Sequence, residues 1–385
     1  MNGSPAVETD NNYIQFSFNI FKMRFVVLAI FLTSSATTVF ANGKLKFSIV
    51  LHRHGDRSPA FVYPSDPYPE SLWRRGLGQL TNLGKNEMYF LGKYIRDRYY
   101  NFLPGIYNEK DIQVISSDIS RTLMSAYSSL AGLYPPQDGD IWLPKMDWQP
   151  IPVHSIPSNQ DNLLYNSRNC TKYEILLQKY LNKNLKKIQG YYNVLQEIFS
   201  YAGIPVKLNS LNYTYIAAGQ GIYDCLFIEQ SYNLTLPEWT VNYYPEPLKE
   251  IALFAFTSLS ATKEMCRLRS GPLLKEILTH FDGVQQGTLK KKMYQYSAHD
   301  QTIIDLLQCL NIYDGEKVPY ASAIFLELSD RNNVSEVLIS YKKRDVVKEL
   351  TIPGCNNMVR CPLDLFKEVV SDMIPEDWEK ECVSV

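Results

Sequence analysis

Residues 45–59 read LKFSIVLHRHGDRSP, an apolar run followed at once by a histidine that lies between two arginines. The run from Leu45 to Leu51 is short and partly β-branched, as is typical of a buried strand. Arginine is always charged, and its planar fork of donors matches two phosphate oxygens at once. We therefore expect a strand that ends in a phosphate-binding loop, in which His54 is the nucleophile and Arg53 and Arg57 form an oxyanion clamp.

The heptapeptide at residues 53–59 is more specific than its first three residues, because a tripeptide often recurs by chance in a chain of 385 residues. Gly55 is expected to let the backbone approach a ligand beside His54. Pro59 is expected to stiffen the exit from the loop.

The length and composition limit the number of domains and the kinds of partner that we expect. A chain of 385 residues can bury one large core, or a core plus a smaller satellite domain. Its 39 basic and 40 acidic residues give a net charge of −1, so no global field attracts nucleic acid or an anionic membrane. We expect no nucleic-acid partner, and any positive potential must be local.

Residues 23–41 have the order of a secretory signal peptide: a basic residue, an apolar run from Phe25 to Leu32, and small residues that end at Ala41. The run is shorter than the roughly 20 residues of a membrane span. Because a polar stretch precedes it, either translation begins at Met23 or the segment is an internal signal-anchor, and the short run favours the first. We expect cleavage near Ala41 and a soluble protein, without a stable membrane anchor, in the extracellular space or the lysosomal lumen.

Cysteines and glycosylation sequons agree with secretion. None of the seven cysteines has the CxxC spacing of a zinc site, so disulfides are expected, with at least one thiol left over and no metal. The cysteines are Cys170, Cys225, Cys266, Cys309, Cys355, Cys361 and Cys382. The sequons predict glycosylation at Asn169, Asn212, Asn233 and Asn333.

Hydrophobic periodicity predicts an α/β fold: a mixed sheet flanked by helices, with a smaller, mostly helical insertion. Strands are expected at 45–51, 111–117 and 292–297, and helices at 81–100, from 118 to before Pro135, and at 302–310. Helical patterns at 173–200 and 273–281 mark the insertion, and 323–328 with 337–341 predict a hairpin at the sheet edge. We divide the chain into an extension with the signal peptide (1–41), two α/β parts (42–143 and 284–385) and the insertion (144–283).

Three segments that are distant in the sequence have charged residues at the junction between a predicted strand and the following helix. Besides the loop after Leu51, Arg121 lies near a helix start, and His299 and Asp300 follow a strand. In α/β sheets, ligands bind at the carboxyl ends of strands, and helix starts attract anions. We therefore expect Arg121 and His299 to bind the same phosphate as the RHGDRSP loop.

The chain resembles the histidine acid phosphatases, the branch of the histidine phosphatase superfamily that includes prostatic, lysosomal and insect venom acid phosphatases. The resemblance extends from about Phe47 to Cys382, and its landmarks are RHGDRSP (53–59), GQLTNLG (78–84), SSDISRTLMSA (116–126), NLTLPEW (233–239), SAHD (297–300), PGC (353–355) and CPL (361–363). It implies a fold like that of phosphoglycerate mutase.

The resemblance also implies a mechanism. His54 would attack phosphorus and form a phosphohistidine, and Asp300 would protonate the leaving group and later help to activate water. Arg53, Arg57, Arg121 and His299 would bind the phosphoryl oxygens, so no metal or cofactor is needed. Because a carboxyl group must carry the donated proton, we expect an acid pH optimum.

Disulfide pairing is inferred from the same resemblance, which supports Cys170 with Cys382 and Cys355 with Cys361. A third bridge of vertebrate members has no equivalent, since its positions are Ile228 and Ala323 here. Cys225 and Cys309 could form a substitute that leaves Cys266 free, or Cys266 could pair with either.

Other polar residues are expected to be structural. His52 is expected in the strand and His280 in a packed helix, whereas His154 could line the cleft. Asp56 occupies a variable motif position, and Asp118 is expected to orient backbone or an arginine.

The predicted activity is hydrolysis of small phosphate monoesters, with phosphoproteins as a further substrate class and a homodimer left open. Phytase, inositol polyphosphate phosphatase and lysophosphatidate phosphatase are narrower alternatives with the same chemistry. Phosphoglycerate mutase chemistry is disfavoured by the signal peptide, the sequons and the His299-Asp300 pair. The non-enzyme alternative is a secreted binding, venom or salivary effector protein with incidental activity.

Overall fold

The computed structural model describes residues 43–166, 168–205 and 213–383, so the predicted signal segment and Asn212 lie outside the described residues. The strands are β1 (Lys44–Arg53), β2 (Ile112–Ser117), β3 (His154–Ile156), β4 (Met293–Ala298), β5 (Ala323–Arg331), β6 (Val334–Lys343), β7 (Val346–Leu350) and β8 (Arg360–Pro362). The helices are α1 (Asn82–Arg98), α2 (Ser120–Leu133), α3 (Thr171–Lys183), α4 (Leu185–Tyr201), α5 (Tyr213–Ser231), α6 (Leu248–Ser258), α7 (Lys263–Arg269), α8 (Gly271–Gln285), α9 (Asp300–Cys309), α10 (Leu363–Val370) and α11 (Trp378–Val383).

The described strands form one mixed sheet in the order β3-β2-β4-β1-β5-β6-β7, and β8 pairs with β6. Strands β1 to β4 are parallel to their neighbours among themselves, whereas β5 pairs with β1 in the antiparallel direction. β1 is central, and every residue from Phe47 to Arg53 is buried, which explains why its sequence is a nearly continuous apolar run. The predicted α/β fold with a mixed sheet is confirmed.

The expected hairpin consists of β5 and β6, but its predicted place at the sheet edge is wrong. Asn332 and Asn333 join the two strands with φ of 50° and 64°, a conformation that Asn tolerates better than most residues. β7 pairs with β6 on its outer side and occupies the edge instead. Most of β7 is not buried, so its sequence lacks the apolar signal that marks the inner strands.

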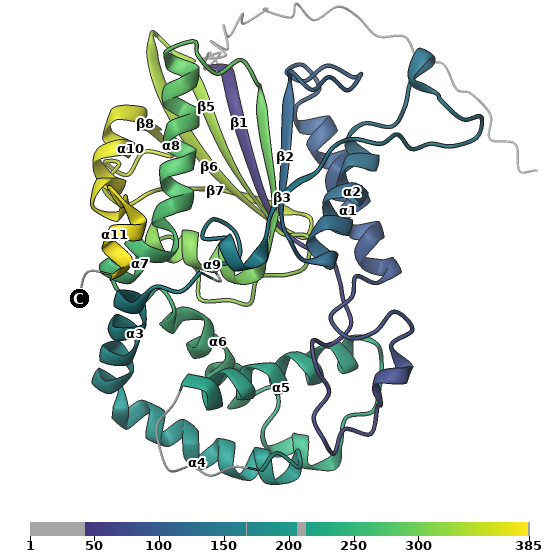
Figure 1. Ribbon diagram of the computed structural model, residues 1–385, viewed down its shortest axis with the longest axis vertical. Coiled ribbons are helices and arrows are strands. Elements are labelled where there is room, and N and C mark those ends of the chain that lie inside the picture. Colours follow the sequence, from purple (N-terminus) through teal and green to yellow (C-terminus); the bar gives the residue numbers. More distant parts are fainter. Residues whose placement is uncertain (1–42, 167, 206–212, 384–385) are drawn as a thin grey trace, which may run out of the picture. The chain divides into compact units, whose positions relative to one another are not determined.

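Helices cover both faces of the sheet, and Figure 1 shows α1 and α2 on one side and α8 and α10 on the other. One hydrophobic cluster joins Val50 of β1 to Leu91 of α1 and Leu130 of α2. A second cluster joins Phe47 and neighbouring β1 residues to α8, α9 and α10.

A separate cluster of buried side chains lies in the helices α4, α5 and α6, and Tyr63 of the loop after β1 belongs to it. The helix expected over 173–200 is interrupted at Asn184, which separates α3 from α4. α8 differs from the other middle helices because Leu274 and Ile277 pack in the core beside the sheet. Within the described segments, no helix combines the length and the apolar character that crossing a lipid bilayer requires.

The described chain contains three disulfides, of which two link distant elements and one closes a short loop. Cys170 joins Cys382 across 212 residues, and Cys355 joins Cys361, the two pairs that the family resemblance implies. The pairing of Cys225 with Cys309 is wrong, because Cys309 joins Cys266, with their Cα atoms 5.5 Å apart. Cys225 is a buried free thiol on α5. The sequon residues Asn169, Asn233 and Asn333 are exposed, as glycosylation requires.

The crossing of α1 and α2 depends on two glycines. A Cβ atom on Gly92 would lie 1.9 Å from the carbonyl oxygen of Ser129, and one on Gly132 would lie 2.0 Å from that of Tyr89. Backbone atoms cannot swing aside as side chains do, so any larger residue must separate the helices. This crossing positions α2, whose first turn carries Arg121.

We predict that Gly92→Ala destabilises the protein by about 1–3 kcal/mol or more, because the added methyl group overpacks the crossing. The matched control is Gly190→Ala in α4, whose Cβ would meet nothing within 4 Å. There, the better helix propensity of alanine should stabilise the protein by up to about 1 kcal/mol. Urea unfolding followed by circular dichroism measures both changes, and a Gly92→Ala midpoint equal to that of the wild type would refute the close crossing.

Candidate active site

The carboxyl ends of three parallel strands bring the predicted site residues together. Arg53 ends β1 and His54 follows it, Arg121 lies in the first turn of α2 after β2, and Asp300 begins α9 after β4. The backbone N–H of His54 donates to the carbonyl of Ala298 at 3.0 Å, which anchors the loop to β4. Residues up to 247 positions apart in the sequence thus meet in one site, because neighbouring parallel strands end at the same edge of the sheet.

The imidazole of His54 has one ring nitrogen engaged with the backbone. Its Nδ1 lies 2.8 Å from the carbonyl oxygen of Gly55. A carbonyl oxygen can only accept a hydrogen bond, so Nδ1 carries the proton and donates it. In the neutral ring, Nε2 is therefore left with a lone pair, as a nucleophile requires.

The surroundings of His54 oppose its protonation. The side chain is buried, and burial lowers its pKa well below 6.5, as do the nearby charges of Arg53 and Arg121. The ring centroid of His299 lies 5.6 Å away and that of Tyr320 5.8 Å away. His54 is consequently neutral even under mildly acidic conditions.

Arg53 is completely buried and held on three sides. Its Nη1 donates to the carbonyl of Val318 at 2.5 Å, and its Nη2 lies 2.8 Å from Oδ2 of Asp300. The guanidinium carbon lies 4.1 Å from the ring centroid of Tyr320, a cation–π contact. These contacts fix the orientation of the guanidinium plane beside His54.

Arg57 is paired with a carboxylate that sequence reasoning missed. Its Nη2 donates to Oδ2 of Asp224 on α5 at 2.8 Å, and Lys317 approaches the other carboxylate oxygen at 3.4 Å. Burial alone would raise the pKa of Asp224, but Arg57 and Lys317 hold it below its usual range. No motif surrounds Asp224 or Lys317 in the sequence, so only the tertiary structure reveals their part.

Arg121 and His299 contact each other. Nη2 of Arg121 lies 3.4 Å from Nδ1 of His299, and Nε2 of His299 lies 2.9 Å from Oγ of Ser117. An arginine can only donate, so Nδ1 accepts and Nε2 carries the proton. Burial and the charge of Arg121 lower the pKa of His299 to about 3, so this histidine is also neutral.

Some guanidinium donors of the site have no protein acceptor. The buried Nε atoms of Arg53, Arg57 and Arg121 find no hydrogen-bond partner in the part of the chain that the structure describes. Leaving buried donors unsatisfied is costly, and each of these donors belongs to a residue expected to contact phosphate. The arrangement is suited to an anion with several oxygens.

Asp300 is the exposed end of this charge cluster. Its side chain is 17% exposed, and Oδ1 accepts a hydrogen bond from the backbone of Gln301 at 2.9 Å. Burial raises the pKa of Asp300, but the charges of Arg53 and Arg57 outweigh it and lower the pKa. A cavity of about 430 Å³ opens here, lined by Arg121, His299 and Asp300 together with residues 164–166, Arg269, Gln301 and Thr302.

Gly55 has a different role from the expected approach of the backbone to a ligand. A Cβ atom there would lie 2.3 Å from the carbonyl oxygen of Gly84 in α1, so the glycine lets the loop pack against a helix. Asp56 accepts hydrogen bonds from Thr81 and Tyr232, both at 2.5 Å. These contacts anchor the loop to Thr81, the residue before α1, and to Tyr232, the residue after α5.

The remaining histidines lie outside this constellation. His52 is buried in β1, where Gln295 contacts its ring at 3.0 Å and burial lowers its pKa to about 4. His280 packs in α8 and contacts the hydroxyl of Tyr296 at 3.0 Å. His154 is exposed on β3 and lines a different cavity from the one at Asp300. Asp118 accepts from Ser155 at 3.2 Å and has no arginine partner among the described ion pairs.

Comparison with known proteins adds independent support. The family model of the histidine phosphatase superfamily (branch 2) matches residues 60–342, a range that begins directly after the RHGDRSP loop. Prostatic acid phosphatase from Bos taurus is 39% identical over 350 residues, which cover 88% of this chain and 88% of the relative. Lysosomal acid phosphatase from Rattus norvegicus is 36% identical over 345 residues, which cover 88% of this chain and 80% of the relative.

Solved structures agree on the fold. The phytase from Citrobacter braakii aligns with a TM-score of 0.64 at 18% identity, over 89% of this chain and all of the phytase chain. At that identity the likeness supports the fold alone. The family match and the two acid phosphatase relatives go further: the chain belongs to branch 2 of the histidine phosphatase superfamily, as a phosphatase of the histidine acid phosphatase type.

Proposed function

We propose that this enzyme hydrolyses small phosphate monoesters at acid pH through a phosphohistidine on His54, with Asp300 as the proton donor. The observation that carries the proposal is the hydrogen bond from Nδ1 of His54 to the carbonyl of Gly55. It leaves Nε2 unprotonated beside guanidinium donors that lack acceptors.

In the first half-reaction, the lone pair of Nε2 forms a bond to phosphorus while the ester P–O bond breaks. The departing oxygen takes the proton of Asp300. Arg53, Arg57 and Arg121 bind the phosphoryl oxygens and stabilise the charge that spreads over them in the transition state. The expected direct contact of His299 with phosphate is replaced by an orienting role, because its Nδ1 accepts from Arg121 and its Nε2 proton faces Ser117. In the second half-reaction, water attacks phosphorus, its proton passes to Asp300, the N–P bond breaks, and inorganic phosphate leaves.

The low pKa of His54 supports activity under acidic conditions. A histidine of ordinary pKa would be largely protonated at about pH 5 and would have no free lone pair. Asp300 requires the opposite state, because it must begin protonated although Arg53 and Arg57 lower its pKa. A bound phosphate anion offsets those positive charges, which raises the pKa of Asp300 in the complex.

The charge balance favours substrates with a single phosphate over the phytase alternative. Lys317 is paired with Asp224, and Arg269 is paired with Asp305 at 2.8 Å. Asp305 therefore neutralises Arg269, and Lys317 shares the one carboxylate of Asp224 with Arg57, whereas an inositol polyphosphate needs several further free cations around the site. Lysophosphatidate and phosphoproteins remain narrower substrate classes to be tested.

We infer secretion or delivery to the lysosome from the disulfides and from the names of the prostatic and lysosomal relatives. Cleavage near Ala41 and formation of a homodimer stay predictions. We further infer that the segment 144–283 acts as a cap, since it contributes Asp224 to the binding of Arg57.

The proposed covalent step is tested with His54→Ala. We expect turnover of p-nitrophenyl phosphate to fall by at least about 10⁴-fold, because the nucleophile is absent. Rapid mixing of the wild type with radiolabelled substrate, quenched in alkali to preserve phosphohistidine, should yield labelled protein. Circular dichroism verifies the fold of the variant. Turnover that survives the substitution would exclude His54 as the nucleophile.

Asp300→Asn tests the proton donor through the leaving group. An alkyl alcohol needs a proton to depart, so kcat for glycerol 2-phosphate should fall by about 10²–10⁴-fold. p-Nitrophenolate departs more readily without a proton, so the first half-reaction with its ester should be less affected. Presteady-state release of p-nitrophenol separates this step from dephosphorylation. Equal losses of the first step for both substrates would argue against the assigned role.

Protonation of His54 can be followed by NMR of histidine-labelled protein, with assignment by His54→Ala. Because the pKa of His54 is lowered, its ring should stay neutral as the pH falls from 6.5 to about 5. Arg121→Gln removes one of the charges that lower this pKa, so the titration should move to higher pH. A wild-type ring that titrates near pH 6.5 would contradict the electrostatic argument.

A further inference from the structure

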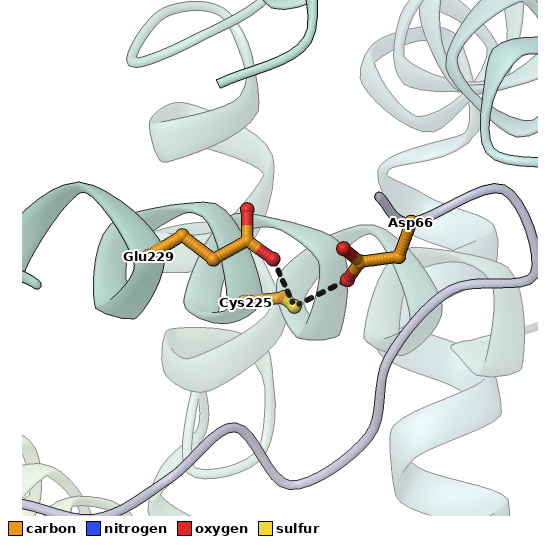
Figure 2. A group of neighbouring side chains, drawn as sticks. All are labelled: Asp66, Cys225 and Glu229. Atoms are coloured by element: carbon orange, nitrogen blue, oxygen red, sulfur yellow. Dashed lines mark hydrogen bonds between the residues drawn. The ribbon is translucent and has the colours of Figure 1, made fainter. Parts of the chain in front are cut away.

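Asp66, Cys225 and Glu229 form a cluster that the proposed reaction does not use (Figure 2). Sγ of Cys225 lies 3.4 Å from Oδ2 of Asp66 and 3.3 Å from Oε1 of Glu229. Cys225 and Glu229 are one turn apart on α5, whereas Asp66 belongs to the loop that follows Pro59. One ligand atom from each of the three residues lies within 4.8 Å of the others.

The cluster is buried and acidic. Cys225 is 1% exposed and Glu229 is 0% exposed. Among the described residues, neither Asp66 nor Glu229 forms an ion pair with a basic side chain. The negative charge of clustered, buried carboxylates must be neutralised, either by protons that they share or by a bound cation.

Two oxygens beside the cluster have no hydrogen-bond partner within the described part of the chain: Oε2 of Glu229 and the hydroxyl of Tyr63. Tyr63 is 1% exposed. Burial raises the pKa of the Tyr63 hydroxyl, and the negative charges of Glu229 and Asp66 raise it further. Buried polar atoms without a partner are rare, and these two are available to a ligand of the cluster.

The spacing is compatible with a zinc site. In a tetrahedral zinc site, a sulfur at about 2.3 Å and an oxygen at about 2.0–2.2 Å from the metal lie about 3.6 Å from each other. The two sulfur–oxygen distances in this cluster, 3.3 and 3.4 Å, are slightly shorter, so a small outward shift of the ligands admits the ion. A thiolate favours zinc over magnesium or calcium, which prefer sites made of oxygen alone.

We propose that Asp66, Cys225 and Glu229 form a binding site for a divalent cation of the zinc type, with a water molecule as the fourth ligand. The cation joins the loop after the RHGDRSP motif to α5. Asp224, the residue before Cys225, pairs with Arg57, so the cation stabilises the support of the phosphate site without contacting substrate. The site is structural, and the proposal does not depend on the phosphohistidine mechanism.

Cobalt binding tests the proposal directly. The full chain is stripped with a chelator, dialysed, and titrated with Co²⁺ near pH 7, where the ligands can lose their protons. We expect one equivalent to bind with a thiolate-to-cobalt charge-transfer absorption in the near ultraviolet, and Zn²⁺ to displace it. The His54→Ala chain should bind Co²⁺ as the wild type does, which separates this site from the catalytic one.

Variants identify the ligands. Cys225→Ser should abolish the charge-transfer band, and Glu229→Gln should weaken Zn²⁺ binding by at least about 100-fold. The matched control is Asp147→Asn, which removes an exposed carboxylate elsewhere and should bind as the wild type does. Circular dichroism of the metal-free variants checks that they fold. If a variant of α5, Cys225→Ser or Glu229→Gln, does not fold, Asp66→Asn in the loop tests the site instead and should also weaken Zn²⁺ binding.

Two results would overturn the site. A wild-type titration without the thiolate band would show that shared protons balance the cluster. A stoichiometric ion that persists unchanged in Cys225→Ser, Glu229→Gln and Asp66→Asn would be an adventitious ion only.

Discussion

Two buried guanidinium groups, those of Arg53 and Arg57, and the partly buried one of Arg121 surround one imidazole, and most of the site is arranged around this concentration of positive charge. Burying a charge without a partner is costly, so Asp300 offsets Arg53 and Asp224 offsets Arg57. The offset is incomplete, since donors on all three arginines stay without a protein acceptor. The site therefore gains most from a ligand that is itself an anion.

The same field decides the state of the nucleophile. Arginine charges and burial keep His54 neutral, while the carbonyl of Gly55 determines which nitrogen carries the proton. The loop geometry thus determines the tautomer of His54, and the guanidinium charges help to lower its pKa. Neither effect requires His54 to move, so the nucleophile is prepared before substrate binds.

The helical segment contributes to the site through α5. Asp224 faces the arginines, and one residue later Cys225 faces the acidic cluster with Asp66 and Glu229. A single helix therefore contacts both the RHGDRSP loop and the segment that follows it. Asp224 and Cys225 are adjacent on α5. A cation or a shared proton that balances the charge of the acidic cluster therefore also affects the position of Asp224.

The local pattern of the sequence predicted most elements near the sheet and the six polar residues that meet at its edge, since apolar periodicity and motif chemistry are local properties. It missed the edge strand β7, whose residues are mostly not buried, and it left Cys309 with two partners because spacing alone cannot pair cysteines. Sequence by itself determined which residues are proposed to carry the phosphate chemistry. Only the tertiary structure decided that Asp224 supports Arg57, that Nε2 of His54 is free, and that Cys225 lies between two carboxylates, because each depends on which distant groups are buried together.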